Sequence, residues 1–144
     1  MLANDMAKIG YLYLKDGIWD GEEIVSKDWV EKSTRSVTYL GNDYDYGYLW
    51  WSRSFLGGYF AAGYQGQYIL VQPDQDVVVV FQSNFVQSEI GEQPFNLIRF
   101  YIIPACGELD SPKHSSSDKM GMCYFLPLLP IPILVRRNQG LRAL

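Results

Sequence analysis

Two glycines, three residues apart, interrupt an extended segment of the chain at residues 63–67, Gly63-Tyr64-Gln65-Gly66-Gln67. Glycine inside a strand costs stability, because it loses more entropy on folding than other residues and packs no side chain. This cost is often tolerated where a ligand or another backbone approaches closely. Backbone beside a glycine also offers an N–H group that can stabilise an oxyanion. On spacing alone, a β-bulge or a corner in a sheet is the more common explanation.

A second pattern with catalytic potential is the Ser-x-x-Lys formed by Ser116 and Lys119. A serine can act as a nucleophile when a neighbouring base removes its proton. This pair lies in a polar, serine-rich stretch that follows the expected strands and has no apolar helix face. A motif indicates catalysis only in its structural context. We therefore expect Ser116 to be an unactivated surface serine.

The composition narrows the class of protein. The chain has 144 residues, of which 48% are hydrophobic and 19% are charged. These values are typical of one domain with a buried core. The net charge of -4 argues against nucleic acid as a partner, because nucleic acid rewards basic patches. One histidine and two cysteines without a CxxC pair argue against a zinc site, and we expect neither a metal nor a cofactor.

Helical periodicity marks the beginning of the chain. Leu2, Met6, Ile9 and Tyr13 form one apolar stripe and predict a helix over residues 2–16. The Asp20-Gly21 pair predicts a tight turn. Ser26 is expected to cap a short helix that runs to about residue 34. We interpret the polar residues 35–45 as a loop.

Strand patterns fill the middle of the chain, over residues 46–52, 59–62, 67–72 and 77–83. The last of these is apolar on both faces, which predicts a central strand in a sheet that is covered on both sides. The short connections predict antiparallel hairpins. A helix should begin at Pro94 and end at Pro104. Together these elements predict an α+β fold with helices packed on an antiparallel sheet.

The character of the sequence changes after Pro104. We expect residues 1–104 to form the folded portion and residues 105–144 to form a polar linker and a proline-rich apolar tail. A membrane helix needs about 20 apolar residues. The apolar run within residues 120–135 is shorter and contains three prolines, which remove backbone donors. A loosely ordered tail is therefore favoured over a membrane anchor, which remains the alternative.

The order of these segments resembles the C-terminal part of the serine β-lactamase-like, penicillin-recognising superfamily. The resemblance lies in residues 46–51 (YGYLWW), 63–67 (GYQGQ) and 68–84, and in residues 5–10 (DMAKIG) before them. It covers roughly residues 2–103. The superfamily includes class C β-lactamases, esterases, D-amino-acid peptidases and hydrolases of 6-aminohexanoate dimers. The resemblance implies a partial β-lactamase/transpeptidase-like fold.

In this superfamily a strand motif supplies a backbone N–H group to the oxyanion hole. The resemblance places that donor at the N–H of Tyr64, with Gly63 and Gly66 allowing close approach and Gln65 and Gln67 bordering the cleft. The family's Lys or His is missing from this motif, which favours a neutral ester or amide over a substrate with a carboxylate. No convincing counterpart exists for the family's Ser-x-x-Lys, so the segment that carries the nucleophile is expected to be absent.

The expected function is therefore that of a C-terminal fragment of a serine hydrolase, inactive alone, whose full protein acts on an ester, amide or β-lactam by acyl transfer. Whether the chain itself is an enzyme is left open. The alternative is a non-catalytic binding module that self-associates through an exposed sheet face, or one that is tethered to a membrane through residues 120–135. The sequence does not indicate a cellular compartment.

Overall fold

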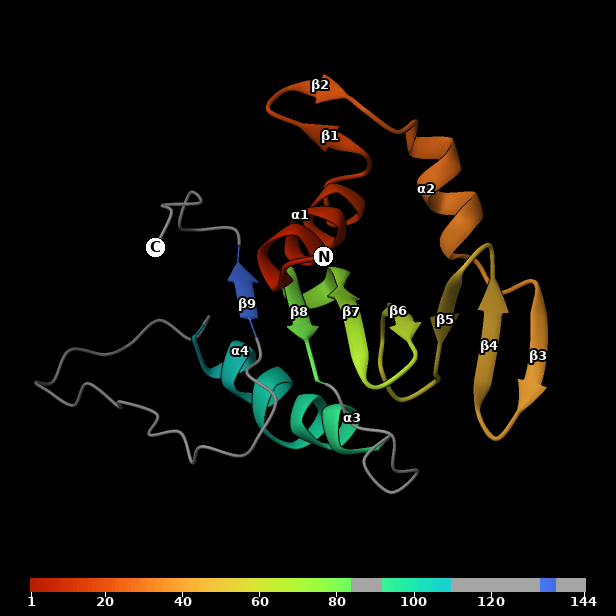
Figure 1. The fold of residues 1–144 in the computed structure, drawn as a ribbon, viewed down its shortest axis with the longest axis vertical. Helices are drawn as coiled ribbons and strands as arrows, with labels where there is room; N and C mark the ends of the chain where they lie inside the picture. The colour runs from red at the N-terminus through yellow and green to blue at the C-terminus, as the bar shows by residue number, and fades with distance from the viewer. Residues whose placement is uncertain (84–91, 110–132, 137–144) are drawn as a thin grey trace, which may run out of the picture.

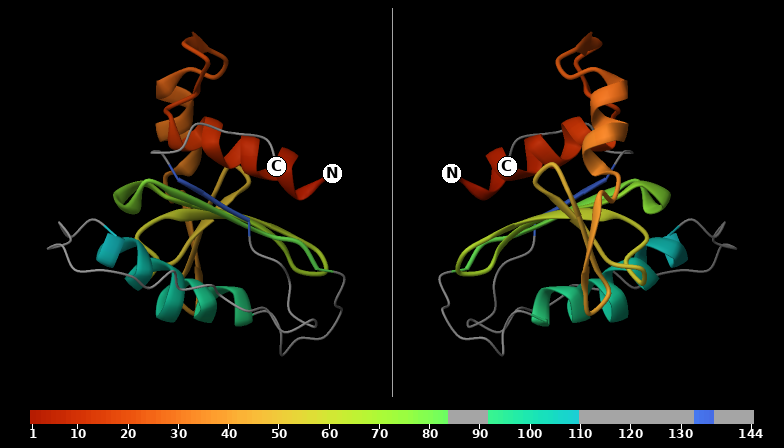
Figure 2. Two further views of the ribbon diagram at one scale, coloured as in Figure 1. Left: turned by 90° about the vertical axis from the view of Figure 1, so that its left-hand side faces the viewer. Right: turned by 90° about the vertical axis from the view of Figure 1, so that its right-hand side faces the viewer.

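The computed structural model of the chain describes residues 1–83, 92–109 and 133–136, and its main feature is one antiparallel sheet (Figure 1). The seven strands of the sheet follow one another in chain order. They are β3 (Thr38–Gly41), β4 (Tyr44–Gly47), β5 (Trp50–Ser52), β6 (Tyr59–Gly63), β7 (Gln67–Gln72), β8 (Val77–Phe81) and β9 (Ile133–Arg136). Helices lie on both sides of this sheet (Figure 2). The predicted α+β class, with helices on an antiparallel sheet, is therefore confirmed.

Helix α1 (Ala3–Leu14) covers one face of the sheet at β7 and β8. The predicted helix exists, but only part of the predicted apolar stripe faces the core, where Tyr13 packs partly buried in the same cluster as Met6. Met6, Ala7 and Gly10 are buried, whereas Leu2 and Ile9 are exposed. The reason is close packing: a Cβ atom at Gly10 would lie 2.5 Å from Val78 Cγ1. Two small residues, Ala7 and Gly10, therefore let α1 approach the sheet closely beside Met6.

The local turn and cap signals of the N-terminal region were correct. Strands β1 (Ile18–Trp19) and β2 (Glu22–Glu23) form a hairpin around Asp20-Gly21, where both residues have positive φ. Helix α2 (Lys27–Thr34) follows. The Ser26 side chain accepts a hydrogen bond from the Trp29 N–H at 3.3 Å, as expected of an N-cap.

The region between residues 35 and 52 differs from the prediction. The predicted loop contains β3 and the start of β4, and the predicted single strand is divided into β4 and β5. Tyr48 and Leu49 form the turn between them, with φ values of 32° and 75°. Neither residue favours positive φ, so the sequence carries no turn signal there. Gly47 is required on packing grounds, because a Cβ atom would collide with the carbonyl oxygen of Arg35.

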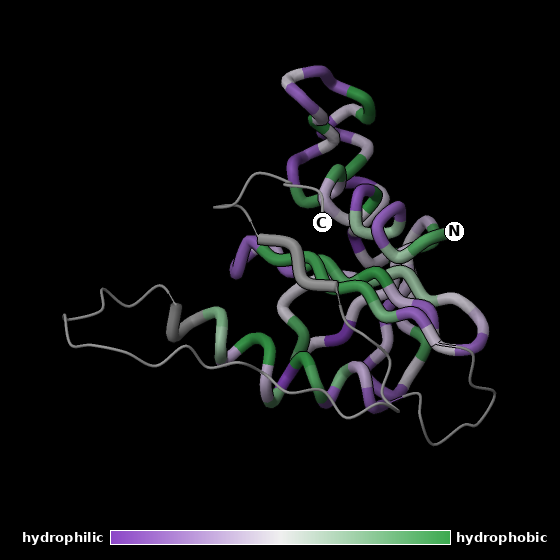
Figure 3. The backbone as a smooth tube through the Cα atoms, turned by 60° about the vertical axis from the view of Figure 1, so that its left-hand side comes forward, coloured by the Kyte–Doolittle hydropathy of each residue, from purple (hydrophilic) through white to green (hydrophobic). Residues whose placement is uncertain are grey.

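Strand β8 is the centre of the core, as its two apolar faces predicted, although it ends at Phe81 rather than at residue 83. All five of its residues are buried. Val78 and Val80 pack with Met6 on the α1 side. Val77, Val79 and Phe81 pack on the other side against the helical segment after residue 92. Figure 3 shows that hydrophobic residues concentrate along these central strands.

The helical segment on the second face does not end at Pro104. It comprises α3 (Gln93–Leu97), the π-helical segment η3 (Ile98–Ile102) and α4 (Ile103–Leu109), and Pro94 lies in its first turn. Proline inside an α-helix clashes with the carbonyl four residues earlier. The wider π-helical turns directly before Pro104 coincide with that position, and the helix continues. The predicted end of this helix at Pro104 is wrong.

Strand β9 corrects part of the predicted tail. Ile133–Arg136 pairs antiparallel with β8 along residues 77–80, so this part of the expected loose tail belongs to the sheet. Residues 110–132, with most of the predicted linker and most of the apolar run, lie outside the described residues. In the described ranges no helix is long and apolar enough to cross a membrane.

Candidate functional site

The predicted site is a sharp turn between β6 and β7. Gly63 and Gln67 form the last paired positions of the two strands, and Tyr64, Gln65 and Gly66 connect them. Gln65 and Gly66 both have positive φ, at 71° and 83°. Glycine tolerates this conformation without steric cost, which explains Gly66. The five residues that the sequence singled out therefore form one hairpin end.

Ser83, just after β8, fixes this turn. Its hydroxyl lies 2.8 Å from the Gln65 carbonyl oxygen and 3.0 Å from that of Gly66, and its single proton is shared between them. In return, Gln67 Nε2 donates to the Ser83 carbonyl oxygen at 2.9 Å. A Cβ atom at Gly66 would collide with the Ser83 hydroxyl. The close approach that glycine permits here is therefore, at least in part, an approach of the chain's own Ser83.

The backbone N–H of Tyr64 is the candidate oxyanion donor. Tyr64 itself is 81% exposed, so its side chain does not cover the turn. Within residues 1–83 and 92–109, no carbonyl or side chain accepts a hydrogen bond from this N–H. Among the described residues, this N–H is therefore not engaged by an acceptor.

The strand that leads to this turn is open along part of one edge. Strand β5 pairs with β6 only at Tyr59 and Phe60. Residues 61–63 have β7 on one side and no partner strand on the other among the described elements. An extended ligand could bond to such an edge through its own backbone-like groups. The open edge ends at the free N–H of Tyr64.

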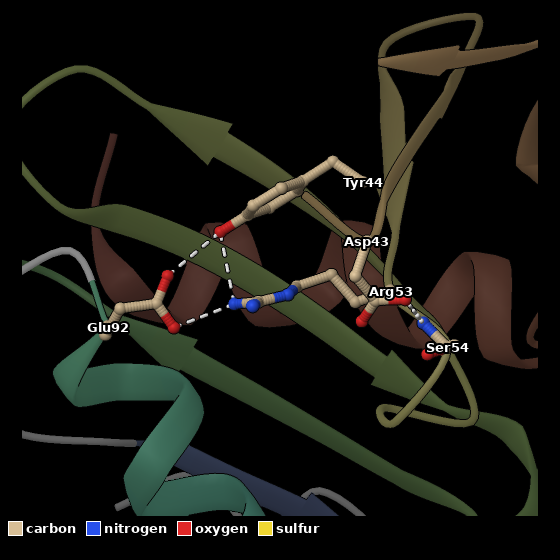
Figure 4. Close-up of polar contacts among 5 residues, drawn as sticks. All are labelled: Asp43, Tyr44, Arg53, Ser54 and Glu92. Atoms are coloured by element: carbon tan, nitrogen blue, oxygen red, sulfur yellow. Dashed lines mark hydrogen bonds and ion pairs between the residues drawn. The ribbon is translucent and has the colours of Figure 1, made fainter. Parts of the chain in front are cut away.

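A second polar cluster, which no sequence motif indicated, joins Tyr44, Arg53 and Glu92 (Figure 4). Arg53 Nη1 donates to Glu92 Oε2 at 2.8 Å and to Tyr44 Oη at 3.1 Å. The Tyr44 hydroxyl donates to Glu92 Oε1 at 3.1 Å. Burial raises the pKa of the Tyr44 phenol, which therefore stays protonated at neutral pH.

Aromatic rings surround the Arg53 guanidinium. It lies 4.5 Å from the ring centroids of Tyr44 and Phe55 and 5.2 Å from that of Phe95. With its charge paired to Glu92, Arg53 links the β4–β5 hairpin to the start of α3. Because Arg53 and Glu92 are far apart in the sequence and neither belongs to a motif, no sequence signal indicated this cluster.

An activated nucleophile is not found among the described residues. The hydroxyl nearest the turn, that of Ser83, donates to two carbonyl oxygens and has no basic partner in its hydrogen bonds. Ser116 and Lys119 lie outside the described ranges. The part of the chain that the structure describes also contains no group of three or more side chains that could hold a metal ion.

Comparisons with known proteins leave the family open. No protein-family model matches the chain, and a search of curated proteins gives no match.

Proposed function

We propose that this chain is the C-terminal part of a β-lactamase-like serine hydrolase and that the turn at residues 63–67 forms half of its oxyanion hole. The observation that carries the proposal is the N–H of Tyr64. This group has no acceptor in the described structure and lies at the end of the open edge of β6. The sequence pattern of residues 46–84 is the second, independent support.

In the reaction of the full protein, a serine from another segment attacks the carbonyl carbon of an ester, amide or β-lactam. The carbonyl oxygen gains negative charge, and the Tyr64 N–H donates to it. One such donor is worth about 2.7–4 kcal/mol in the transition state. The tetrahedral intermediate then collapses, the bond to the alcohol or amine breaks (in a β-lactam the ring opens), and the leaving group takes up a proton. Water hydrolyses the resulting acyl-enzyme and frees the serine. The motif contains no cation, and this favours a substrate without a carboxylate at that position.

The chain alone should have negligible turnover. One oxyanion donor cannot replace a nucleophile and its base, because a serine without an adjacent base is a weak nucleophile. The test is intact-mass analysis of the folded 144-residue chain after exposure to a fluorophosphonate and to an activated ester. We expect no stoichiometric adduct. A stoichiometric adduct on a serine would contradict the fragment hypothesis, and a Ser116→Ala variant would show whether Ser116 carries it.

A non-catalytic binding module is the second candidate function, and an exposed aromatic patch favours it. Trp29 and Tyr48 pack edge to face at 5.4 Å, and Lys32 Nζ lies within 6 Å of both ring centroids. Leu49 beside them is 78% exposed. Positive φ at bulky residues, as at Tyr48 and Leu49, is costly and concentrates at functional sites. Self-association of the purified chain in sedimentation experiments would favour this candidate, and a monomer at all concentrations would count against it.

A further inference from the structure

A pocket of about 430 Å³ lies on the α1 side of the sheet, next to the turn. Its volume is within the range of about 300–1,000 Å³ that is usual for small-molecule sites. The walls come from α1, from the ends of β6 and β7 and from the residue after β8. They include Met6, Ala61, Gly63, Gln67, Ile69 and Gln82. None of the side chains that line the pocket among the described residues is charged, but Met1 also lines it and carries the N-terminal ammonium.

Two glutamine side chains supply the polar groups of this pocket. Gln67 Nε2 donates to the Ser83 carbonyl oxygen at 2.9 Å, and Gln82 Nε2 donates to the Met1 carbonyl oxygen at 3.2 Å. These bonds orient both amides. In the described residues neither Oε1 atom receives a hydrogen bond. The Oε1 of Gln67 lies over Gly63, where an added Cβ atom would come within 2.9 Å of it.

We propose that this pocket binds an uncharged amide that carries a short alkyl chain. The alkyl chain packs on Met6, Ala61 and Ile69, and the amide N–H groups donate to the Oε1 atoms of the two glutamines. Neither an ester nor a carboxylate has a donor for these oxygens, and a cation would meet the like charge of the Met1 ammonium. The inference goes beyond the proposed function, because binding needs neither a serine nor the Tyr64 N–H.

The test is a titration of the 144-residue chain with hexanamide, hexylammonium, hexanoate and methyl hexanoate, followed by ¹⁵N–¹H NMR. Hexanamide should bind with a Kd at least about tenfold lower than that of either ion or of the ester, and should shift the amide signals of Ala61, Gly63 and Gln67. Equal affinity for all four compounds, or no binding, would overturn the proposal. A failed fluorophosphonate test would leave this result unchanged, so the two proposals fail separately.

Variants separate the pocket from other surfaces. Ala61→Phe fills the pocket and should raise the Kd of hexanamide at least about tenfold, whereas the same change at exposed Ala105 in α4 should leave it unchanged. Unchanged binding in folded Ala61→Phe would refute the site. If Ala61→Phe does not fold, Gln82→Glu decides: the preference for hexanamide over hexylammonium should fall about tenfold, because the new carboxylate pairs with the cation. An unaltered preference would also refute the site.

Discussion

Replacing Gln72 with methionine should stabilise the protein. Gln72 ends β7, is only 1% exposed and pairs with Val77, so its side chain lies on the core face that Val77 occupies. Among the described residues, neither its Nε2 nor its Oε1 has a hydrogen-bond partner. The backbone of Gly58 packs closely on the amide, since a Cβ atom there would lie 2.9 Å from Nε2. Methionine has a similar length and no amide to leave unbonded.

The magnitude follows from the cost of burying an unbonded amide, about 1–3 kcal/mol in mutational data. Imperfect packing of the thioether should remove part of this gain, so we expect the free energy of unfolding to rise by about 1–2 kcal/mol. Urea denaturation followed by circular dichroism should show a midpoint higher by roughly 0.5–1 M with an unchanged slope. The Tm should rise by about 3–8 °C.

The matched control is Gln67→Met, the same chemical change at an amide that is bonded. It removes the hydrogen bond to the Ser83 carbonyl oxygen and should lower the free energy of unfolding by about 0.5–1.5 kcal/mol. Opposite signs for the two variants would support the reasoning. An unchanged or lower midpoint for folded Gln72→Met would refute it and would indicate that the Gln72 amide is bonded, for example to a buried water.

Two further predictions concern the α3 side of the sheet and the buried tyrosines. Arg53→Ala should lower the free energy of unfolding by about 2–4 kcal/mol, because it removes packing against three rings and the hydrogen bonds of Arg53 to Tyr44 and Glu92. Glu92→Gln, at a carboxylate that is 56% exposed, should cost less than about 1 kcal/mol in the same urea assay. Burial raises the pKa values of Tyr44, Tyr59 and Tyr68 in the folded state, so the unfolded chain loses these protons first. This contribution to stability is complete below about pH 10 and is lost as the pH rises through the raised pKa values of the folded state. Tyr59→Phe removes one of the three phenols. In urea titrations above that pH, the free energy of unfolding of this variant should therefore fall less steeply with pH.

Local sequence signals predicted much of the fold. The unbroken apolar run of β8, the Ser26 cap and the Asp20-Gly21 turn each depend on neighbouring residues, and all three were correct. The turn at Tyr48 and Leu49 was not predictable in this way, because residues that disfavour positive φ adopt it there under tertiary constraint. Strand β9 was missed for a related reason. Its pairing with β8 joins segments that are distant in the chain.

In the candidate site, too, the features with a local sequence signal were predicted and those that depend on distant contacts were not. Glycine spacing indicated an interruption of the extended structure at residues 63–67, and the structure has a hairpin turn there. The part played by Ser83 depends on where the end of β8 meets the turn, and a serine at that position has no signature of its own. The assignment of the Tyr64 N–H to an oxyanion hole stays a prediction, because it concerns a ligand and a second segment.

Strand β9 also has a consequence for the chain before folding is complete. Four consecutive valines and a phenylalanine form β8, and they contain no charge and no proline that would oppose pairing with another chain. Such segments are prone to aggregate when their edge is open. Residues 77–81 are synthesised before residues 133–136, so the edge of β8 that pairs with β9 stays without this partner until β9 has been made. Arrival of β9 ends that interval, and a chain cut short before residue 133 would never leave it.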